Sequence, residues 1–353
     1  MKLTTRVLPD KGHVINLYPL YITVLGLGAF TVLRILHQLF CVLLQTFLLP
    51  GTSLTNFGSH EGAWAVVTGC TDGIGKEFAR QLGKAGFNLL LVARDVERLS
   101  STAQEIELMY GIKTHIHTIN FGKASVNEYT ELTETLERHD IGVLVNNVGT
   151  SWRFSRFTET PREKISDMIQ INVNATVQVT HAVLPGMVKR KRGLVLNVGS
   201  FSGAFPIPML AAYSSTKAFL ANFTSALAEE VRSDNVMVEY LNAYYVVTKL
   251  SGIRRPSVFI PTTKIYVQSV LSKIGLPCGS AYSGRLNASS PYWPHALLDL
   301  MLTFFCKVYP SAAMVMISGT TQPGLELGGV MGGKAELDCW CLTPEIKTHN
   351  EMQ

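Results

Sequence analysis

Residues 64–75 read WAVVTGCTDGIG, a short apolar run that leads directly into a glycine-rich turn. The run has the β-branched composition of a buried strand, and an amphipathic helical pattern follows the turn. In such a turn, backbone amides can approach a pyrophosphate closely, and the helix N-terminus adds donors and a favourable dipole. Gly69, Gly73 and Gly75 could also form a tight strand-to-helix connection and nothing more, so the motif needs support from the rest of the chain.

The same alternation of short β-branched runs and longer amphipathic segments continues from residue 61 to about residue 285. It predicts strands over residues 64–68, 88–93, 113–119, 141–146, 194–198 and 236–241. It predicts helices over residues 74–85, 96–110, 161–189 and 211–232. Such alternation forms βαβ units, so we expect an α/β fold of the Rossmann type, with a doubly wound parallel sheet covered by helices on both faces. Ligands of these sheets bind beyond the carboxyl ends of the strands.

The second predicted strand ends in Ala93 and Arg94, where a dinucleotide-binding fold meets the ribose of the adenosine. A carboxylate at this position favours the free 2′-hydroxyl of NAD, whereas a guanidinium suits the 2′-phosphate of NADP. Arg94 therefore favours NADP, unless it merely pairs with the neighbouring carboxylate of Asp95.

A tyrosine and a lysine four residues apart, Tyr213 and Lys217, lie on one face of the last predicted helix. An ammonium close to a phenol lowers the phenol pKa from about 10 toward neutral pH, where the phenol works as a general acid or base. Alone, this pair would be read as a half-exposed helix face. It occurs together with the glycine turn, with Ser200 at the end of the fifth strand and with NNVG at residues 146–149, and this combination favours a catalytic site.

Within residues 64–217 the chain carries, in order, the motifs TGxxxGIG, NNxG, a serine and YxxxK, and in this it resembles the short-chain dehydrogenase/reductase family. The resemblance covers residues 60–290, which we expect to form one NADP-binding reductase domain. Further segments resemble the microsomal branch of the family, namely residues 184–187, 206–208, 213–219 and 247–250. That branch contains very-long-chain 3-oxoacyl-CoA reductases and 17-beta-hydroxysteroid dehydrogenases, which also carry an N-terminal membrane segment.

The resemblance implies a role for each member of a catalytic group. Tyr213 would donate a proton to the substrate carbonyl oxygen while the nicotinamide delivers hydride to the carbonyl carbon. Lys217 would hold the nicotinamide ribose and acidify Tyr213, and Ser200 would hydrogen-bond the carbonyl oxygen and stabilise its developing charge. Asn172, which matches the asparagine of the family's catalytic tetrad, would support a proton relay through water.

The resemblance also implies NADPH as the cofactor. Its expected contacts are the glycine turn, two strand tips, the catalytic pair and the loop after the sixth strand: Gly69, Thr71, Asp72, Gly73, Ile74, Gly75, Arg94, Asn120, Asn147, Tyr213, Lys217, Val246 and Thr248. Two positions depart from the family pattern, since Asn120 replaces the usual aspartate near the adenine and Ala243 replaces the usual proline after the sixth strand. The second departure predicts a looser loop on the nicotinamide side.

The composition of the chain narrows its class. Of 353 residues, 47% are hydrophobic and only 16% are charged, and the mean hydropathy is +0.20, which excludes disorder as the main state. The 31 basic and 26 acidic residues give a net charge of +5, too small and too dispersed to indicate nucleic-acid binding. The six cysteines have the spacing of neither a disulfide framework nor a metal site, so we expect a reducing compartment and no bound metal.

The longest apolar stretch, residues 17–50, has the character of a membrane anchor. A signal peptide has an apolar core of about 7–15 residues and a small-residue cleavage site, whereas this stretch is longer and lacks such a site. A buried core helix seldom lacks a polar face over such a length. As one helix the stretch exceeds the thickness of the hydrocarbon core, so we expect it to tilt or to bend back at Arg34. Because basic residues precede it, the positive-inside rule places residues 1–16 in the cytosol.

Residues 291–318 form a second apolar segment, interrupted by Asp299, Lys307 and Pro310. This segment could lie in the membrane surface, form a lid over the substrate, or pack on the core. Residues 319–353 have scattered glycines and no periodicity, so we expect a disordered tail.

These features are compatible with several functions. The first is NADPH-dependent reduction of 3-oxoacyl-CoA to 3-hydroxyacyl-CoA in very-long-chain fatty acid elongation, with a long-chain acyl-CoA, membrane lipid and other elongation components as partners. The second is the same chemistry on a steroid or another lipid ketone. In both cases the apolar residues near the site would line the pocket: Phe201, Phe205, Met209 and Leu210.

The third function, a non-catalytic scaffold of the elongation assembly, is disfavoured because the catalytic residues are intact. NADPH and acyl-CoA are most simply met from the cytosol. We therefore expect an endoplasmic reticulum membrane protein whose reductase domain faces the cytosol, which a hairpin near Arg34 would allow.

Overall fold

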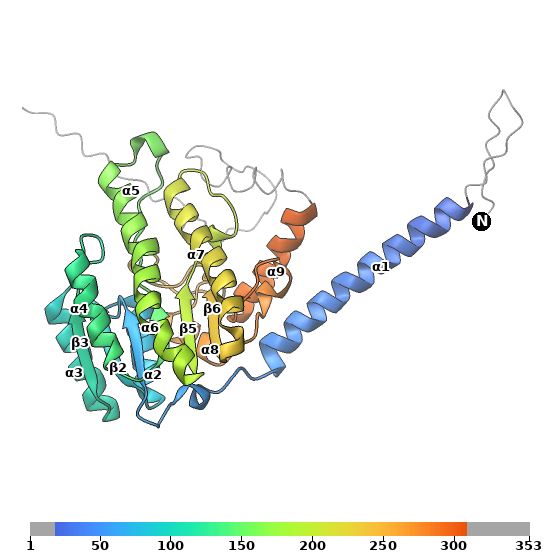
Figure 1. The fold of residues 1–353 in the computed structure, drawn as a ribbon. Helices are drawn as coiled ribbons and strands as arrows, with labels where there is room; N and C mark the ends of the chain where they lie inside the picture. Colours follow the sequence, from blue (N-terminus) through green and yellow to red (C-terminus); the bar gives the residue numbers. More distant parts are fainter. Residues whose placement is uncertain (1–17, 309–353) are drawn as a thin grey trace, which may run out of the picture.

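The structure, a computed structural model, describes residues 18–308. Its centre is a parallel sheet in the order β3-β2-β1-β4-β5-β6-β7 (Figure 1). The strands are β1 (Trp64–Thr68), β2 (Asn88–Ala93), β3 (Thr114–Thr118), β4 (Ile141–Asn146), β5 (Gly193–Val198), β6 (Val236–Leu241) and β7 (Ala288–Ser289). The strand order reverses between β1 and β4, which confirms the expected doubly wound sheet of the Rossmann type.

Helices cover both faces of this sheet (Figure 1). One face packs against α2 (Gly73–Lys84), α3 (Val96–Tyr110) and α8 (Thr263–Leu271), and the other against α4 (Val126–Glu137), α6 (Ala175–Arg190) and α7 (Ala211–Glu230). Short 3-10 turns span Leu54–Phe57, Phe157–Glu159, Phe201–Gly203, Arg232–Asp234 and Gly279–Tyr282. Successive strand residues point to opposite faces, so Val67 packs in one layer and Val66 in the other. Because both of their faces are buried, the central strands β1, β2, β4 and β5 are largely apolar runs, whereas the edge strand β3 is partly exposed and polar.

The long helix expected over residues 161–189 is interrupted. It consists of α5 (Arg162–Ile169), a π-helical turn (Gln170–Asn174) and then α6. A π-turn shifts the hydrogen-bonding register of a helix, and such turns are frequent at functional sites. This one carries Asn172, which is fully buried.

The N-terminal apolar stretch forms α1 (Tyr18–Leu43), which continues into a π-helical turn (Leu44–Leu48). Within residues 18–308, this is the one helix long and apolar enough to cross a membrane. The helix runs through Arg34 without a break, so the expected hairpin at this residue is wrong (Figure 1). A single arginine is a good helix former, and a kink requires proline, a π-turn or an inserted group. Across a membrane, a helix of this length would therefore have to tilt.

The C-terminal end of α1 is attached to the domain built on the sheet. Lys273 donates to the carbonyl of Leu49 at 2.5 Å, and the Thr52 amide donates to the carbonyl of Ile274 at 2.8 Å. The ring of Phe47 lies 6.3 Å from that of Trp293, the first residue of α9 (Trp293–Val308). The start of α9 thus lies beside the end of α1.

The described part of α9 has two different sides. His295, Asp299 and Thr303 are buried, whereas Met301 and Phe304 are exposed. Of the alternatives for residues 291–318, packing on the core therefore holds for the buried side of α9. Residues 309–318, the tail expected over 319–353 and the N-terminus expected over 1–16 lie outside the described residues.

Candidate active site

The glycine turn lies at the carboxyl end of β1, beside the point where the strand order reverses. Gly69 and Gly73 have φ values of +66° and +58°, a left-handed conformation that favours glycine. A Cβ on Gly75 would collide with the carbonyl oxygen of Gly69 and with the side chain of Asn147. The sequence motif is therefore needed to let the start of α2 approach the end of β1 this closely.

Asn147 supports this turn from the loop after β4. Its side-chain amide donates to the carbonyls of Thr68 and Gly69, at 3.0 and 3.1 Å. The Thr68 hydroxyl in turn accepts from the amides of Asn147 and Val148, at 3.0 and 3.1 Å. Asn147, expected to contact the cofactor, is thus committed to holding β1 and β4 together beneath the turn.

Asp72 caps α2 at the same place. Its carboxylate accepts from the Gly73 amide at 2.8 Å and pairs with Lys249 at 2.5 Å. The hydrogen bond from Lys249 holds the pKa of Asp72 below its usual value. Two other predicted contacts flank the cap: Ile74 packs on the core, and Thr71 is partly buried.

The loop after β6 faces the glycine turn. A Cβ on Gly73 would lie 3.5 Å from the methyl group of Thr248, so these two residues border one narrow space. Val246 is buried, and its carbonyl accepts from the Ser251 hydroxyl at 2.7 Å. The expected looseness of this loop is not found at Ala243, because its amide donates to Leu241 and its carbonyl accepts from Phe201. A proline here could not make the first of these bonds.

Two predicted residues follow neighbouring strands at the adenosine end. Arg94 is exposed directly after β2, and Asn120 is exposed after β3. Asp95 caps α3 by accepting from the Arg98 amide at 3.1 Å, and its carboxylate pairs with the Arg98 side chain at 3.7 Å rather than with Arg94. The alternative explanation of Arg94, as the ion-pair partner of Asp95, therefore does not hold.

The expected catalytic residues converge from separate elements. Tyr213 and Lys217 lie on α7, with the Lys217 ammonium 6.0 Å from the centre of the Tyr213 ring. Ser200 directly precedes the 3-10 turn after β5, and its side chain lies close enough to Tyr213 to lower the pKa of the phenol. At the opposite side, a Cβ on Gly149 would lie 3.5 Å from Asn172 Oδ1 and 3.7 Å from Lys217 Nζ. The fold thus brings these four side chains to one edge of the sheet.

Asn172 is held by the loop after β4. Its Oδ1 accepts from the Thr150 amide at 2.8 Å, and its Nδ2 donates to the Thr150 carbonyl at 2.9 Å and to the Thr216 hydroxyl at 3.0 Å. The π-turn therefore connects the loop after β4 with α7.

The electrostatics of the tyrosine differ from the expectation. Burial raises the pKa of Tyr213, and hydrogen bonds with Ser200 and Ser202 offset part of this rise. Burial also lowers the pKa of Lys217 to about 8. The predicted lowering of the Tyr213 pKa by Lys217 is not seen in this structure, in which the ammonium donates to the Val198 carbonyl at 2.9 Å. The phenol is consequently held in its protonated, proton-donating form.

An apolar hollow leads to Tyr213. Its lining includes Met209 and Leu210, which the sequence predicted, together with Trp152 and Met168, which it did not. Phe201 and Phe205 lie 5.4 Å apart, and Phe201 stacks on Tyr244 at 4.8 Å. Trp152 and Met168 approach Tyr213 only through the fold, and no local motif marks them.

Comparisons with known sequences give the following matches. Residues 63–257 match the family described as short chain dehydrogenase. The chain is 60% identical over 280 residues to a very-long-chain 3-oxoacyl-CoA reductase of Coprinopsis cinerea, covering 79% of this chain and 83% of that relative. It is 45% identical over 286 residues to a very-long-chain 3-oxoacyl-CoA reductase of Mycosarcoma maydis, covering 79% of this chain and 81% of that relative.

Solved structures share the fold. A short-chain dehydrogenase from Sphingobium yanoikuyae in complex with NADPH matches with a TM-score of 0.58 at 21% identity, covering 76% of this chain and 99% of that one. The structure of a 7beta-hydroxysteroid dehydrogenase matches with a TM-score of 0.62 at 23% identity, covering 73% and 97%. At these identities the likeness extends to the fold alone.

Proposed function

Since the chain belongs to the short chain dehydrogenase family, we propose that it is an oxidoreductase that uses NADPH to reduce very-long-chain 3-oxoacyl-CoA to 3-hydroxyacyl-CoA. The observation that carries the proposal is the convergence of Tyr213, Ser200, Lys217 and Asn172 at the edge of the sheet that also carries the glycine turn, with Tyr213 at the wall of a hollow. Relatives that are 60% and 45% identical over most of their length bear the name of this reductase.

The cofactor proposal rests on the fit of the residues present. The glycines bring the N-terminus of α2, with its backbone amide donors, close to the end of β1, and Thr248 faces Gly73 across a narrow space. Arg94, whose neighbour Asp95 is engaged by Arg98, offers a guanidinium for a 2′-phosphate. Asn120 Oδ1 accepts from the Gly122 amide at 3.2 Å, which leaves its NH₂ group to bond an adenine edge.

In the proposed reaction the Tyr213 hydroxyl donates its proton to the 3-oxo oxygen. NADPH, when bound, supplies the hydride that adds to the carbonyl carbon, so that the product is a secondary alcohol. The Ser200 hydroxyl hydrogen-bonds the same oxygen and stabilises the charge that develops on it. The raised pKa of Tyr213 keeps the proton on the phenol until the oxygen becomes basic enough to take it.

After this transfer, Tyr213 must be protonated again. The Lys217 ammonium, with its pKa of about 8, is mostly protonated at neutral pH and lies on the same helix face. Asn172 holds the Thr150 backbone and, in the proposed reaction, would support a proton relay through water. Lys217 would also hold the nicotinamide ribose in the proposed complex.

The substrate assignment is tested by a direct comparison of rates. The purified full-length protein is supplied with a long-chain 3-oxoacyl-CoA or with a steroid ketone, each with NADPH and with NADH. The proposal predicts the highest kcat/KM for the acyl-CoA with NADPH. A higher kcat/KM for the steroid would overturn the substrate class, and no cofactor consumption with either would favour a non-catalytic scaffold.

We further propose that the protein resides in the endoplasmic reticulum membrane, anchored by residues 17–50, with its domain in the cytosol and other elongation components as partners. Because α1 is unbroken, one crossing would put the residues before and after it on opposite sides. The basic residues Lys2, Arg6 and Lys11 favour a cytosolic N-terminus instead. We place the domain in the cytosol, and the N-terminus on the other side of the membrane, because NADPH and acyl-CoA are supplied from the cytosol. In sealed microsomes, protease should digest the domain and spare an N-terminal epitope tag, whereas protection of the domain would contradict the orientation.

A further inference from the structure

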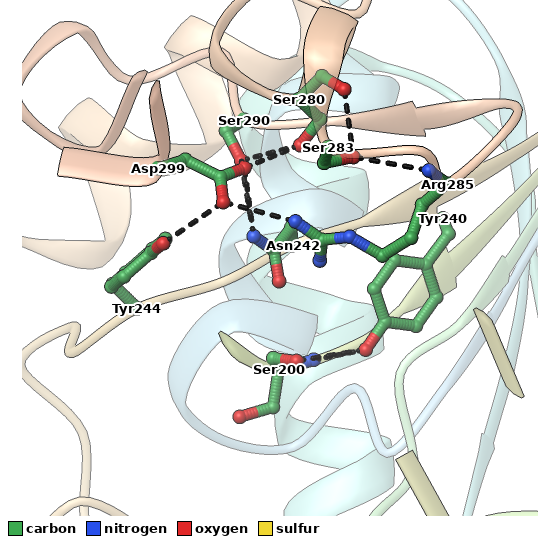
Figure 2. Close-up of polar contacts among 9 residues, drawn as sticks. All are labelled: Ser200, Tyr240, Asn242, Tyr244, Ser280, Ser283, Arg285, Ser290 and Asp299. Atoms are coloured by element: carbon green, nitrogen blue, oxygen red, sulfur yellow. Dashed lines mark hydrogen bonds and ion pairs between the residues drawn. The ribbon is translucent and has the colours of Figure 1, made fainter. Parts of the chain in front are cut away.

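Tyr240, near the end of β6, lies fully buried against the Ser200 turn (Figure 2). The glycines on either side of this turn make room for it. A Cβ on Gly199 would collide with the Tyr240 ring, and a Cβ on Gly203 would lie 2.7 Å from its hydroxyl oxygen. The aromatic ring therefore packs directly against the backbone that carries Ser200.

The hydroxyl of Tyr240 uses both of its hydrogen-bonding functions on one residue. It accepts from the Ser200 amide at 2.9 Å and donates to the Ser200 carbonyl at 2.8 Å (Figure 2). Burial raises the pKa of Tyr240, so the hydroxyl keeps its proton and both bonds persist across the physiological pH range. The main-chain groups on both sides of the Ser200 Cα are thereby fixed to β6.

The end of β6 is in turn fixed by a buried carboxylate on α9 (Figure 2). Asp299, which is fully buried, accepts hydrogen bonds from separate segments of the chain: Asn242 at 3.0 Å, Tyr244 at 3.1 Å, Ser280 at 2.6 Å, Arg285 at 2.9 Å and Ser290 at 2.7 Å. Because Asn242 and Tyr244 follow Tyr240 closely along the chain, the carboxylate holds the backbone on which Tyr240 is mounted.

The side chain of Ser200 is held by Ser202, in the turn whose backbone Tyr240 fixes. Its oxygen accepts from the Ser202 amide at 3.2 Å and from the Ser202 hydroxyl at 2.8 Å. With its oxygen accepting these two bonds, Ser200 retains its own hydrogen to donate to a carbonyl oxygen.

We propose that Tyr240 is a positioning residue, which holds Ser200 so that its hydroxyl meets the 3-oxo oxygen of the substrate. This inference rests on the proposed function of Ser200. It assigns to Tyr240 no contact with substrate or cofactor. Its effect is transmitted through the Ser200 backbone.

The test is the variant Tyr240→Phe, which keeps the ring in its slot and removes the hydroxyl. The Ser200 amide then loses its partner, and the Ser200 carbonyl keeps only the hydrogen bond from the Gly203 amide at 2.9 Å. The turn is therefore free to shift until the amide finds a new partner. Since a displacement of about 1 Å at a catalytic group costs about 100-fold in rate, kcat should fall about 10- to 100-fold. The KM for acyl-CoA and the affinity for NADPH should change less than about twofold, because neither depends on the direction of the Ser200 hydroxyl.

A double-mutant cycle separates positioning from a general structural loss. If Tyr240 acts through Ser200, Tyr240→Phe should cause little further loss of kcat in the Ser200→Ala background. An equal fold-loss in both backgrounds would overturn the proposal, and so would an unchanged kcat in Tyr240→Phe when Ser200→Ala is inactive. Full activity of Ser200→Ala would instead overturn the proposed function of the site.

Tyr266→Phe is the matched control. Tyr266 is also a fully buried tyrosine, but within the described part of the chain its hydroxyl has no hydrogen-bond partner. This variant should retain wild-type kcat.

If Tyr240→Phe does not yield folded protein, hydrogen exchange of the wild-type enzyme gives the answer. The Ser200 amide should exchange as slowly as the amides of β6, and rapid exchange would overturn the proposal.

Discussion

The two turns that form the site, after β1 and after β5, lie at the same edge of the sheet but are specified differently. The glycine turn owes its shape to its own sequence, because Gly69 and Gly73 have positive φ and Gly75 must lack a Cβ. The Ser200 turn owes its position to a residue 40 positions away, since Tyr240 bonds both of its main-chain groups. The backbone conformation of the glycine turn is thus encoded locally, with support from Asn147, whereas the position of Ser200 is encoded by long-range packing.

The largest expected effect is the loss of activity on removing the proposed proton donor, the Tyr213 hydroxyl. Tyr213→Phe should lower kcat about 10²- to 10⁴-fold, because the phenol is the general acid. NADPH affinity should stay within about twofold, since the glycine turn is untouched. Steady-state kinetics and a fluorescence titration with NADPH measure the two quantities, and a fully active variant would refute the assigned role.

A methyl group added to the glycine turn should weaken the binding of NADPH. In Gly75→Ala the new Cβ meets the backbone of Gly69, so the turn must open and NADPH affinity should fall about 10- to 100-fold. Gly28→Ala in α1 is the matched control, because its Cβ would meet nothing within 4 Å. If both variants bind NADPH like the wild type, the glycine turn does not hold the cofactor.

The charge of Arg94, directly after β2, should determine the preference for NADPH over NADH. Arg94→Ala should raise the KM for NADPH about tenfold and leave the KM for NADH nearly unchanged, because only NADPH carries the 2′-phosphate. The two KM values are measured with the same acyl-CoA substrate. An equal change in KM for both cofactors would show that Arg94 does not bind the 2′-phosphate.

A buried acid outside both turns should affect stability rather than activity. Burial raises the pKa of Glu239 on β6 from 4.5 to about 7, although the Gly275 amide donates to it. The folded chain therefore holds this proton more tightly than the unfolded chain, so stability is lost as pH rises from about 4.5 through 7.

Glu239→Gln should remove this pH dependence. Unfolding free energies from denaturant titration should be similar for variant and wild type at pH 5. At pH 8 the variant should be more stable, by about 1–3 kcal/mol. A difference that is the same at both pH values would mean that Glu239 does not titrate as its burial indicates.

Local patterns made most of the fold predictable. The expected strands appear within a residue or so of their predicted ends, since most of them are apolar runs, and the glycine turn falls where its motif placed it. By contrast, β7 consists of Ala288 and Ser289 alone, too few residues to show a pattern. The unbroken course of α1 was mispredicted because Arg34 was taken as a place to bend, although arginine continues a helix.

The site was predictable as a set of residues but not as a network. Motif order indicated Ser200, Tyr213 and Lys217, and the structure brings them together. The roles of Tyr240 and Asp299 depend on contacts between distant segments, which no single window of sequence contains. Desolvation of Tyr213 likewise depends on the packed surroundings, which explains why its pKa moves opposite to the expectation from its neighbour alone.

The central claim is that Tyr213 and NADPH together reduce a 3-oxoacyl-CoA. It is tested most directly by mass spectrometry of the product formed from a long-chain 3-oxoacyl-CoA and NADPH that carries deuterium at C4 of the nicotinamide, on each face in turn. We predict that one of the two labelled forms gives 3-hydroxyacyl-CoA with deuterium at C3 in the presence of the wild-type protein, and that Tyr213→Phe gives almost none. Absence of deuterated product with the wild type, or equal amounts with both proteins, would contradict the account.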